Sequence, residues 1–264
     1  MPNPASGFQG DPVALEFRGV GKSFGALAAL EAIDLAIQKG ERHGLIGANG
    51  AGKTTLFGIA AGALSQSAGE VRFLGQDLAG KRPFERVRMG MRRTFQSSNI
   101  VHELSVRDNV ALSAVGITPA RHSLGTAALK KARSQADDLL ARVQLEARAG
   151  DLARELSHGE MRQLEIACAL TGTPRLLLLD EPAAGLSVAE RKRLRTVLAE
   201  LDAGLTMVMI EHDMEFTMSV VSRVTLLHNG RIVTQGTSEE MARDPSVRAV
   251  YLGRQHDSGK HPQN

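Results

Sequence analysis

This chain has a single cysteine, a small net charge and no long apolar run, and each of these features excludes a class of structure or partner. The 264 residues include one cysteine, Cys168, so no disulfide framework can form within the chain, and a reducing compartment suits it. The longest apolar runs, at 176–179 and 205–210, fall far short of the roughly twenty residues that span a bilayer. The formal net charge of +3 gives no sign of nucleic-acid binding. We therefore expect no nucleic-acid partner, and membrane contact only through another protein.

Other features of the composition are ordinary. Charged and apolar residues make up 23% and 42% of the chain, which excludes global disorder. Residues 1–7 have neither a basic start nor an apolar stretch, so no secretory signal is predicted. Cys168 lies within an apolar helical run, and we expect it to pack in the core rather than to react.

The periodicity of the apolar residues predicts an α/β fold. Alternating positions such as Val13, Leu15 and Phe17 indicate strands, and the run at 176–179 indicates a buried strand. Alternating strands and helices imply a mostly parallel sheet that is covered on both faces. Midway along the chain the pattern becomes helical, which predicts an inserted subdomain. We expect one domain at 13–253, between disordered tails at 1–12 and 254–264. Within the domain, residues 13–96 and 166–253 should form the α/β core, and residues 97–165 the helical subdomain.

The stretch from Gly47 to Thr55 fits a phosphate-binding loop, with Gly47, Gly52, Lys53 and Thr54 at the fixed positions. Glycines let backbone N–H groups approach a triphosphate closely, Lys53 supplies charge, and the Thr54 hydroxyl can ligate Mg²⁺. An incidental glycine turn and a dinucleotide-binding loop are the alternatives. The apolar strand before the loop, the helix after it and the Lys-Thr pair favour a triphosphate site. The residues expected to contact the nucleotide are Asn49, Gly50, Ala51, Gly52, Lys53, Thr54 and Thr55.

Two acids, Asp180 and Glu181, follow the buried strand at 176–179. Ligands of open α/β sheets bind beyond the carboxyl ends of the strands. We therefore expect Asp180 near Mg²⁺ and Glu181 near the water that attacks the γ-phosphate. A solvated strand end is the alternative, and the phosphate loop in the same chain argues against it.

A third segment, Ser157 to Glu160, fits the capping box that begins a helix. A helix start with a serine hydroxyl and a glycine, here Gly159, also suits an anion. With this segment between the phosphate loop and Asp180, the chain resembles the ATP-binding cassette (ABC) ATPases, and residues 156–163 are similar to their signature motif.

The resemblance implies a P-loop NTPase core with a mostly parallel sheet, an N-terminal antiparallel β subdomain and an inserted α-helical subdomain. It assigns adenine stacking to Phe24, a link between Mg²⁺ and the attacking water to Gln96, and contact with the γ-phosphate to His212. The expected catalytic residues are then Glu181, His212, Gln96 and Lys53, and the expected metal ligands are Thr54, Gln96 and Asp180. Ser157, Gly159 and Glu160 are expected to contact the ATP of a facing cassette. ATP and Mg²⁺ are the implied cofactors.

Several segments resemble the ATPase subunits of branched-chain amino acid importers, whose relatives import urea or other small amides. They are 93–96, 105–110, 181–186, 211–214 and 251–253. The resemblance implies a peripheral subunit on the cytoplasmic face of the inner membrane. Its partners would be a second cassette, either a paralogue or a copy of itself, two transmembrane permease subunits and, indirectly, a periplasmic or extracellular substrate-binding protein.

Three positions depart from the family pattern. His158 and Glu160 replace the commoner Gly and Gln, which predicts a weaker contact with the partner's phosphate, and Ser187 stands where many cassettes carry Asp. Two other functions stay open. A soluble cassette ATPase would act on DNA, ribosomes or cofactor assembly, but the chain lacks the long coiled coils or second cassette of such proteins. A nucleotide sensor without hydrolysis would be expected to lack Glu181 and His212.

Overall fold

The computed structural model describes residues 12–94, 100–117 and 126–247. Nearly all of the expected tails, together with Gln96 and the segment 251–253, lie outside these ranges. Within them, none of the helices combines the length and apolarity that a bilayer crossing requires. The border expected at 165–166 falls inside a helix, α5 (His158–Ala169).

A six-stranded sheet forms the centre of the described structure, in the order β10-β9-β3-β8-β7-β6. Neighbouring strands are parallel except β9 and β10, which confirms the mostly parallel sheet. Its strands are β3 (Arg42–Gly47), β6 (Met91–Arg93), β7 (Leu176–Asp180), β8 (Thr206–Ile210), β9 (Arg223–His228) and β10 (Arg231–Thr237).

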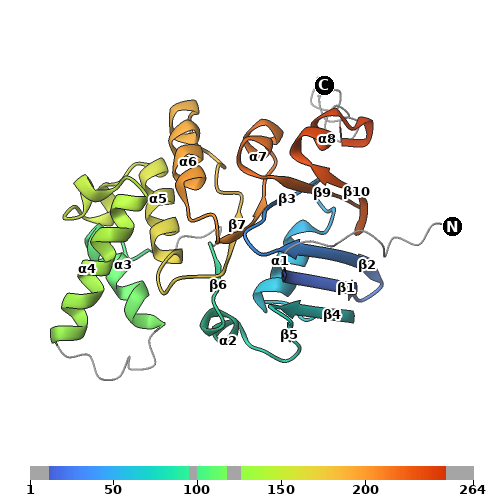
Figure 1. Cartoon of the computed structure of the whole chain (residues 1–264), viewed down its shortest axis with the longest axis horizontal. Helices are drawn as coiled ribbons and strands as arrows, with labels where there is room; N and C mark the ends of the chain where they lie inside the picture. Colours follow the sequence, from blue (N-terminus) through green and yellow to red (C-terminus); the bar gives the residue numbers. More distant parts are fainter. Residues whose placement is uncertain (1–11, 95–99, 118–125, 248–264) are drawn as a thin grey trace, which may run out of the picture.

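A second, antiparallel sheet lies at the N-terminal side, at the lower right of Figure 1, in the order β2-β1-β4-β5. Its strands are β1 (Val13–Phe24), β2 (Leu27–Gln38), β4 (Ala68–Phe73) and β5 (Gln76–Asp77). The helix α1 (Lys53–Ala61) shares one apolar core with both sheets. This core holds α1 rigidly behind the phosphate loop.

The four leucines of β7 show why the central sheet needs cover on both faces. Leu176 and Leu178 pack in the core that contains α1, while Leu177 and Leu179 pack in the core on the opposite face. Successive strand side chains point to opposite faces, so a continuous apolar run is what a doubly covered strand requires. The face of the sheet opposite α1 is covered by α6 (Val188–Glu200), α7 (Met214–Val220) and α8 (Ser238–Arg243), which lie along the top of Figure 1.

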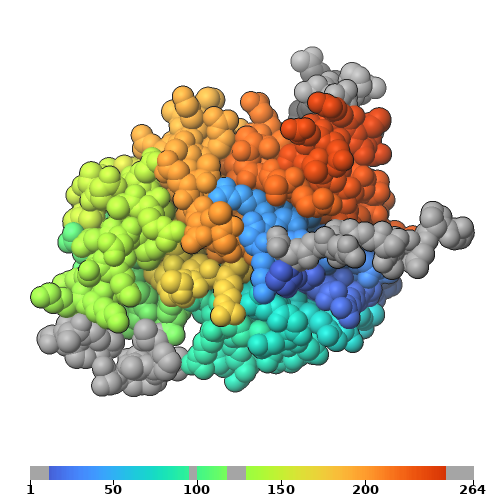
Figure 2. Space-filling view, in the orientation of Figure 1, coloured from blue at the N-terminus to red at the C-terminus, as the bar shows by residue number. Residues whose placement is uncertain are grey.

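A helical block forms the left side of Figures 1 and 2, away from the antiparallel sheet. It contains α3 (Val106–Gly116), α4 (Thr126–Arg142), α5 and the short 3-10 turns η1 (Glu146–Arg148) and η2 (Ala153–Glu155). The buried residues of α4 follow helical spacing: Ala132, Ala136 and Leu140 are buried, while Leu129 is exposed. The inserted helical subdomain of the predicted fold class is thereby confirmed.

Arginines cluster at 86–93, in the last part of α2 (Pro83–Arg88) and in β6, two elements that were not predicted from the sequence. Arg86 is buried because its Nη1 donates hydrogen bonds to the carbonyls of Ile59 and Ala60 at the end of α1, at 2.6 and 2.8 Å. The last carbonyls of a helix have no partner within it, and a guanidinium supplies one. A charged residue in this stretch therefore stabilises a helix end rather than facing solvent.

Side chains cap several helix ends. At the C-terminal end of α6, Arg42 donates to the carbonyls of Leu198, Ala199 and Leu201. The capping box that the sequence predicts at Ser157 is present, and further capping boxes begin α6 at Ser187 and α8 at Thr237.

Candidate active site

Three neighbouring parallel strands bring the predicted motifs to one edge of the sheet. The register places Leu45 of β3 opposite Ile210 of β8, and Ile210 opposite Asp180 of β7. The phosphate loop follows β3, His212 follows β8, and Glu181 follows β7. Since parallel strands end at the same edge, these segments adjoin one another although they are far apart in the sequence.

The glycines of the loop are required for two different reasons. Gly47 has φ +151°, and a Cβ there would lie 2.2 Å from the carbonyl oxygen of Leu227. Gly52 has φ +102°, and its Cβ would lie 2.6 Å from a methyl carbon of Leu30. Gly50 has φ +78° but open space around it, so only its backbone conformation favours glycine.

Lys53 begins α1 and is 5% exposed. Its Nζ donates to the carbonyl oxygens of Gly47 and Ala48 at 2.8 and 2.9 Å, which holds the ammonium charge over the loop. The positive end of the helix dipole points into the same loop. Thr54, in the first turn, is exposed to solvent. Together these groups form a positively charged site for an anion.

Asp180 is the last residue of β7 and is 1% exposed. Its Oδ2 accepts a hydrogen bond from Nη2 of Arg93 at 2.7 Å, and its backbone N–H donates to the Thr94 hydroxyl at 3.3 Å. The second carboxylate oxygen, Oδ1, is buried and has no hydrogen-bond partner among the described residues. A buried carboxylate oxygen without a partner is costly, and it is the kind of atom that a divalent cation or its water ligates.

Glu181 and His212 face each other across the edge of the sheet. The Nε2 of His212 lies 2.5 Å from Oε1 of Glu181, and both side chains are partly exposed. Glu181 has φ +48°, which costs a non-glycine residue about 1–2 kcal/mol. Strain of this kind persists where the surrounding structure imposes it, and it is common at functional sites. A carboxylate and an imidazole meeting at this edge can orient and deprotonate a water.

The Ser157–Glu160 segment begins α5 with Ser157 and His158 exposed to solvent. The backbone N–H groups of Ser157, Gly159 and Glu160 have acceptors within the chain. The Ser157 hydroxyl accepts from the Glu160 N–H at 3.3 Å, and the Gly159 N–H donates to Oε1 of Glu190 at 2.9 Å. Glu190 also belongs to the capping box that begins α6, and its contact with α5 was not predicted from the sequence.

A family model described as ABC transporter matches residues 30–184, more than half of the chain. The chain belongs to the ABC transporter family. It is 35% identical over 255 residues to the high-affinity branched-chain amino acid transport ATP-binding protein LivG of Salmonella typhimurium, across 90% of this chain and 97% of LivG. It is also 31% identical over 244 residues to the lipopolysaccharide export system ATP-binding protein LptB of Acidithiobacillus ferridurans, across 91% of this chain and 97% of LptB.

Among solved structures, the ADP conformation of MJ1267, an ATP-binding cassette of an ABC transporter, superposes with a TM-score of 0.79 at 28% identity. The superposition covers 91% of this chain and 99% of MJ1267. The fold class predicted from the sequence is thereby confirmed, and the chain is a nucleotide-binding ATPase of this family.

Two predicted residues of the cassette are not joined to the site by described contacts. Phe24 is 46% exposed at the end of the β1–β2 hairpin, with Nζ of Lys22 at 4.9 Å from the centre of its ring. The same hairpin passes the phosphate loop, because Leu30 and Ala29 of β2 border Gly52. Gln96 lies outside the described residues.

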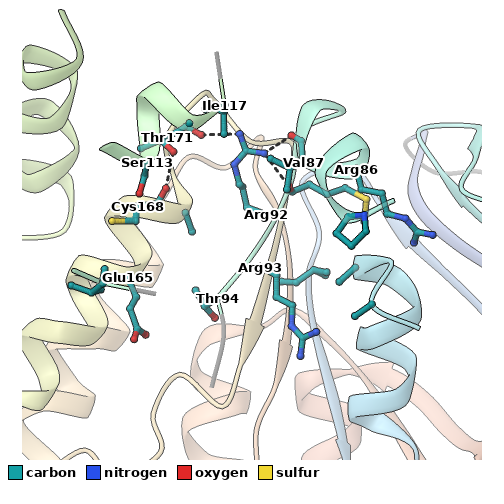
Figure 3. Close-up of a pocket in the computed structure, with 18 residues that line it drawn as sticks. Arg86, Val87, Arg92, Arg93, Thr94, Ser113, Ile117, Glu165, Cys168 and Thr171 are labelled. Atoms are coloured by element: carbon teal, nitrogen blue, oxygen red, sulfur yellow. Dashed lines mark hydrogen bonds between the residues drawn. The ribbon is translucent and has the colours of Figure 1, made fainter. Parts of the chain in front are cut away.

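An apolar groove of about 370 Å³ separates β6 from the helical block of the cassette (Figure 3). Arg93 and Thr94 line one side, while Ser113 and Cys168 line the other. Arg93 therefore borders the groove and is also the ion-pair partner of Asp180. Sequence reasoning missed this pairing, since nothing local to Arg93 marks its partner.

Proposed function

We propose that this cassette is the ATP-hydrolysing subunit of an ABC importer for branched-chain amino acids or a related small polar solute such as urea or an amide. The observation that carries the proposal is the contact of Glu181 with His212 at the edge of the sheet where the phosphate loop and Asp180 also lie. A nucleotide sensor has no need of a strained glutamate that meets a histidine at this place.

In the proposed mechanism, two cassettes enclose each ATP between the phosphate loop of one chain and the Ser157–Glu160 segment of the other. The exposure of Ser157 and His158 supports this, because a facing chain can reach them. ATP closes the dimer and hydrolysis reopens it, since the γ-phosphate bridges the two halves.

Within each site, Glu181 orients and deprotonates the attacking water, while His212 and Lys53 stabilise charge on the transferring phosphoryl group. Thr54 and Asp180, with Gln96, would hold Mg²⁺, which supplies positive charge to the phosphate oxygens. The buried, unpartnered Oδ1 of Asp180 supports this ligand set. Phe24 would stack on the adenine at the turn end of the β1–β2 hairpin.

The transport partners are two transmembrane permease subunits, which places the cassette on the cytoplasmic face of the membrane. The groove between β6 and the helical block supports a docking site for a permease segment, since it is largely apolar and borders Arg93. The second cassette is a paralogue or a copy of this chain, and a substrate-binding protein acts through the permease. The likeness to LivG across nearly the full length of both chains supports import, and the likeness to LptB makes export the alternative.

Replacing Glu181 by Gln tests the catalytic assignment. We expect the rate of phosphate release to fall about 10²- to 10⁴-fold while ATP binding is retained, because the amide cannot accept a proton. Glu240→Gln in α8 is the matched control, since it makes the same chemical change at a capping glutamate remote from the site. Unchanged hydrolysis in the Glu181 variant would contradict the assignment.

Uptake of labelled solutes tests the transport assignment. In cells that lack the encoding gene, leucine uptake should fall, and it should be restored by the wild-type chain but not by E181Q. Loss of urea uptake with normal leucine uptake would instead assign urea or a related amide as the transported solute. If neither changes, the import proposal is wrong and export becomes the better assignment.

A further inference from the structure

A buried carboxylate joins the two strand ends that carry Glu181 and His212. Glu211 directly follows β8 and is 3% exposed. Its Oε1 accepts the backbone N–H of Ala183 at 2.6 Å, and its Oε2 accepts the backbone N–H of His212 at 3.1 Å. The side chain therefore spans from one catalytic segment to the other.

The buried carboxylate of Glu211 has no cationic partner: none of the ion pairs among the described residues includes it. Burial raises the pKa of Glu211, the charge of Glu181 raises it further, and backbone N–H groups, those of Ala183 and His212 foremost, oppose the rise. A buried carboxyl group with only backbone donors gives little net stability, so its role is to fix geometry.

The geometry that it fixes includes a strained residue. Glu181 has φ +48°, and its own N–H donates to the carbonyl of Ile210 at 2.9 Å. The turn that follows is closed by the N–H of Ala184, which donates to the carbonyl of Glu181 at 3.1 Å. Glu211 anchors the middle of this turn at Ala183, so the turn cannot relax independently of the His212 backbone.

We propose that Glu211 is a positioning residue that sets the separation of the Glu181 turn from the His212 backbone, so that the carboxylate and the imidazole converge on the γ-phosphate of ATP. This inference rests on the proposed function. Two acceptor oxygens are needed, one for each N–H. Glutamine has a single carbonyl oxygen, and its NH₂ group would face an N–H donor. Aspartate keeps the charge but is one methylene too short to reach both segments.

The test compares E211Q and E211D with the wild-type chain and with E240Q. Glu240 is a suitable control because its Oε2 accepts the N–H of Thr237 at 2.8 Å, a similar hydrogen bond far from the site. We expect kcat for ATP hydrolysis to fall about 10- to 100-fold in both Glu211 variants, since small displacements of catalytic groups have effects of this size. The Kd for ATP should stay close to wild type, and E240Q should hydrolyse normally. The melting temperature should fall by only a few degrees, because one buried backbone N–H loses its acceptor.

A double variant separates positioning from general destabilisation. If Glu211 acts through Glu181, then E181Q/E211Q should be no slower than E181Q alone, because groups that act as a unit are not additive. Wild-type hydrolysis in E211Q, losses that multiply in the double variant, or a parallel loss of ATP binding and thermal stability would each overturn the proposal. So would failure of both Glu211 variants to fold. Full activity of E181Q would instead overturn the proposed function, whatever E211Q does.

Discussion

Removing the Arg93 side chain tests how far the buried carboxylate of Asp180 depends on a protein counterion. Asp180 is 1% exposed, and Arg93 is its only ion-pair partner among the described residues. In Arg93→Met the carboxylate would stay buried while the guanidinium is replaced by an uncharged chain of similar length.

The expected loss follows from that burial. Breaking a buried ion pair by removing one partner costs about 3–5 kcal/mol of unfolding free energy, because the other charge is left uncompensated. For a domain near this size each kcal/mol shifts the melting temperature by about 2–4 °C, so R93M should melt roughly 6–20 °C lower. Adding Asp180→Asn removes the stranded charge and should recover part of the loss, with a coupling free energy of about 1–3 kcal/mol.

Urea unfolding of the wild-type chain, both single variants and the double variant gives the full cycle. The cycle isolates the Arg93–Asp180 pair from any other contact of Arg93. An R93M loss below about 1 kcal/mol, or a cycle that is additive, would refute the argument that Arg93 compensates this carboxylate. Mg²⁺ with ATP should stabilise R93M more than wild type, since it supplies the missing positive charge.

Three further predictions follow from individual residues. Gly47→Ala should abolish ATP binding and destabilise the fold, because the added Cβ would lie 2.2 Å from the carbonyl oxygen of Leu227. Gly50→Ala should lower the free energy of unfolding by only about 1–2 kcal/mol, because only its backbone conformation favours glycine. Urea unfolding and nucleotide titration compare the two variants. Burial raises the pKa of the Cys168 thiol from 9.0 to about 11. Thiolate-specific labelling at pH 8 should therefore be slow until the chain unfolds. The stabilisation that comes from the buried neutral thiol should be lost as the pH rises from about 9 to 11. Glu190→Ala should tighten ATP-dependent dimerisation, measured by light scattering, because the Gly159 N–H that now donates to Oε1 of Glu190 at 2.9 Å would be free to donate to a phosphate. Glu190→Gln is the control, since its amide oxygen can still accept this N–H. Unchanged or weaker dimerisation in the alanine variant would contradict this.

The parts of the site that were predictable are the local ones. The phosphate loop and the pair Asp180–Glu181 are short patterns whose chemistry is contained in adjacent residues, and the capping box at Ser157 is equally local. Such patterns place residues on a strand end or a helix start without knowledge of the rest of the fold.

The contacts that were missed are long-range. Arg93 pairs with a residue 87 positions away, Glu211 reaches 28 positions back, and Glu190 reaches 31 positions back. Each of these three residues is charged and lies next to a recognisable motif. The motif by itself explains why a charged residue stands there, so the sequence gives no sign of the distant partner. The strand β6 was missed for a related reason, because its three residues contain two arginines and acquire strand geometry only by pairing with β7.

Sedimentation velocity of the E181Q chain with ATP and Mg²⁺ tests the central claim, that two cassettes complete each nucleotide site. We expect a two-chain species with saturating ATP and Mg²⁺, and single chains with ADP or without nucleotide. A single-chain species at saturating ATP, or a two-chain species that is indifferent to nucleotide, would contradict it.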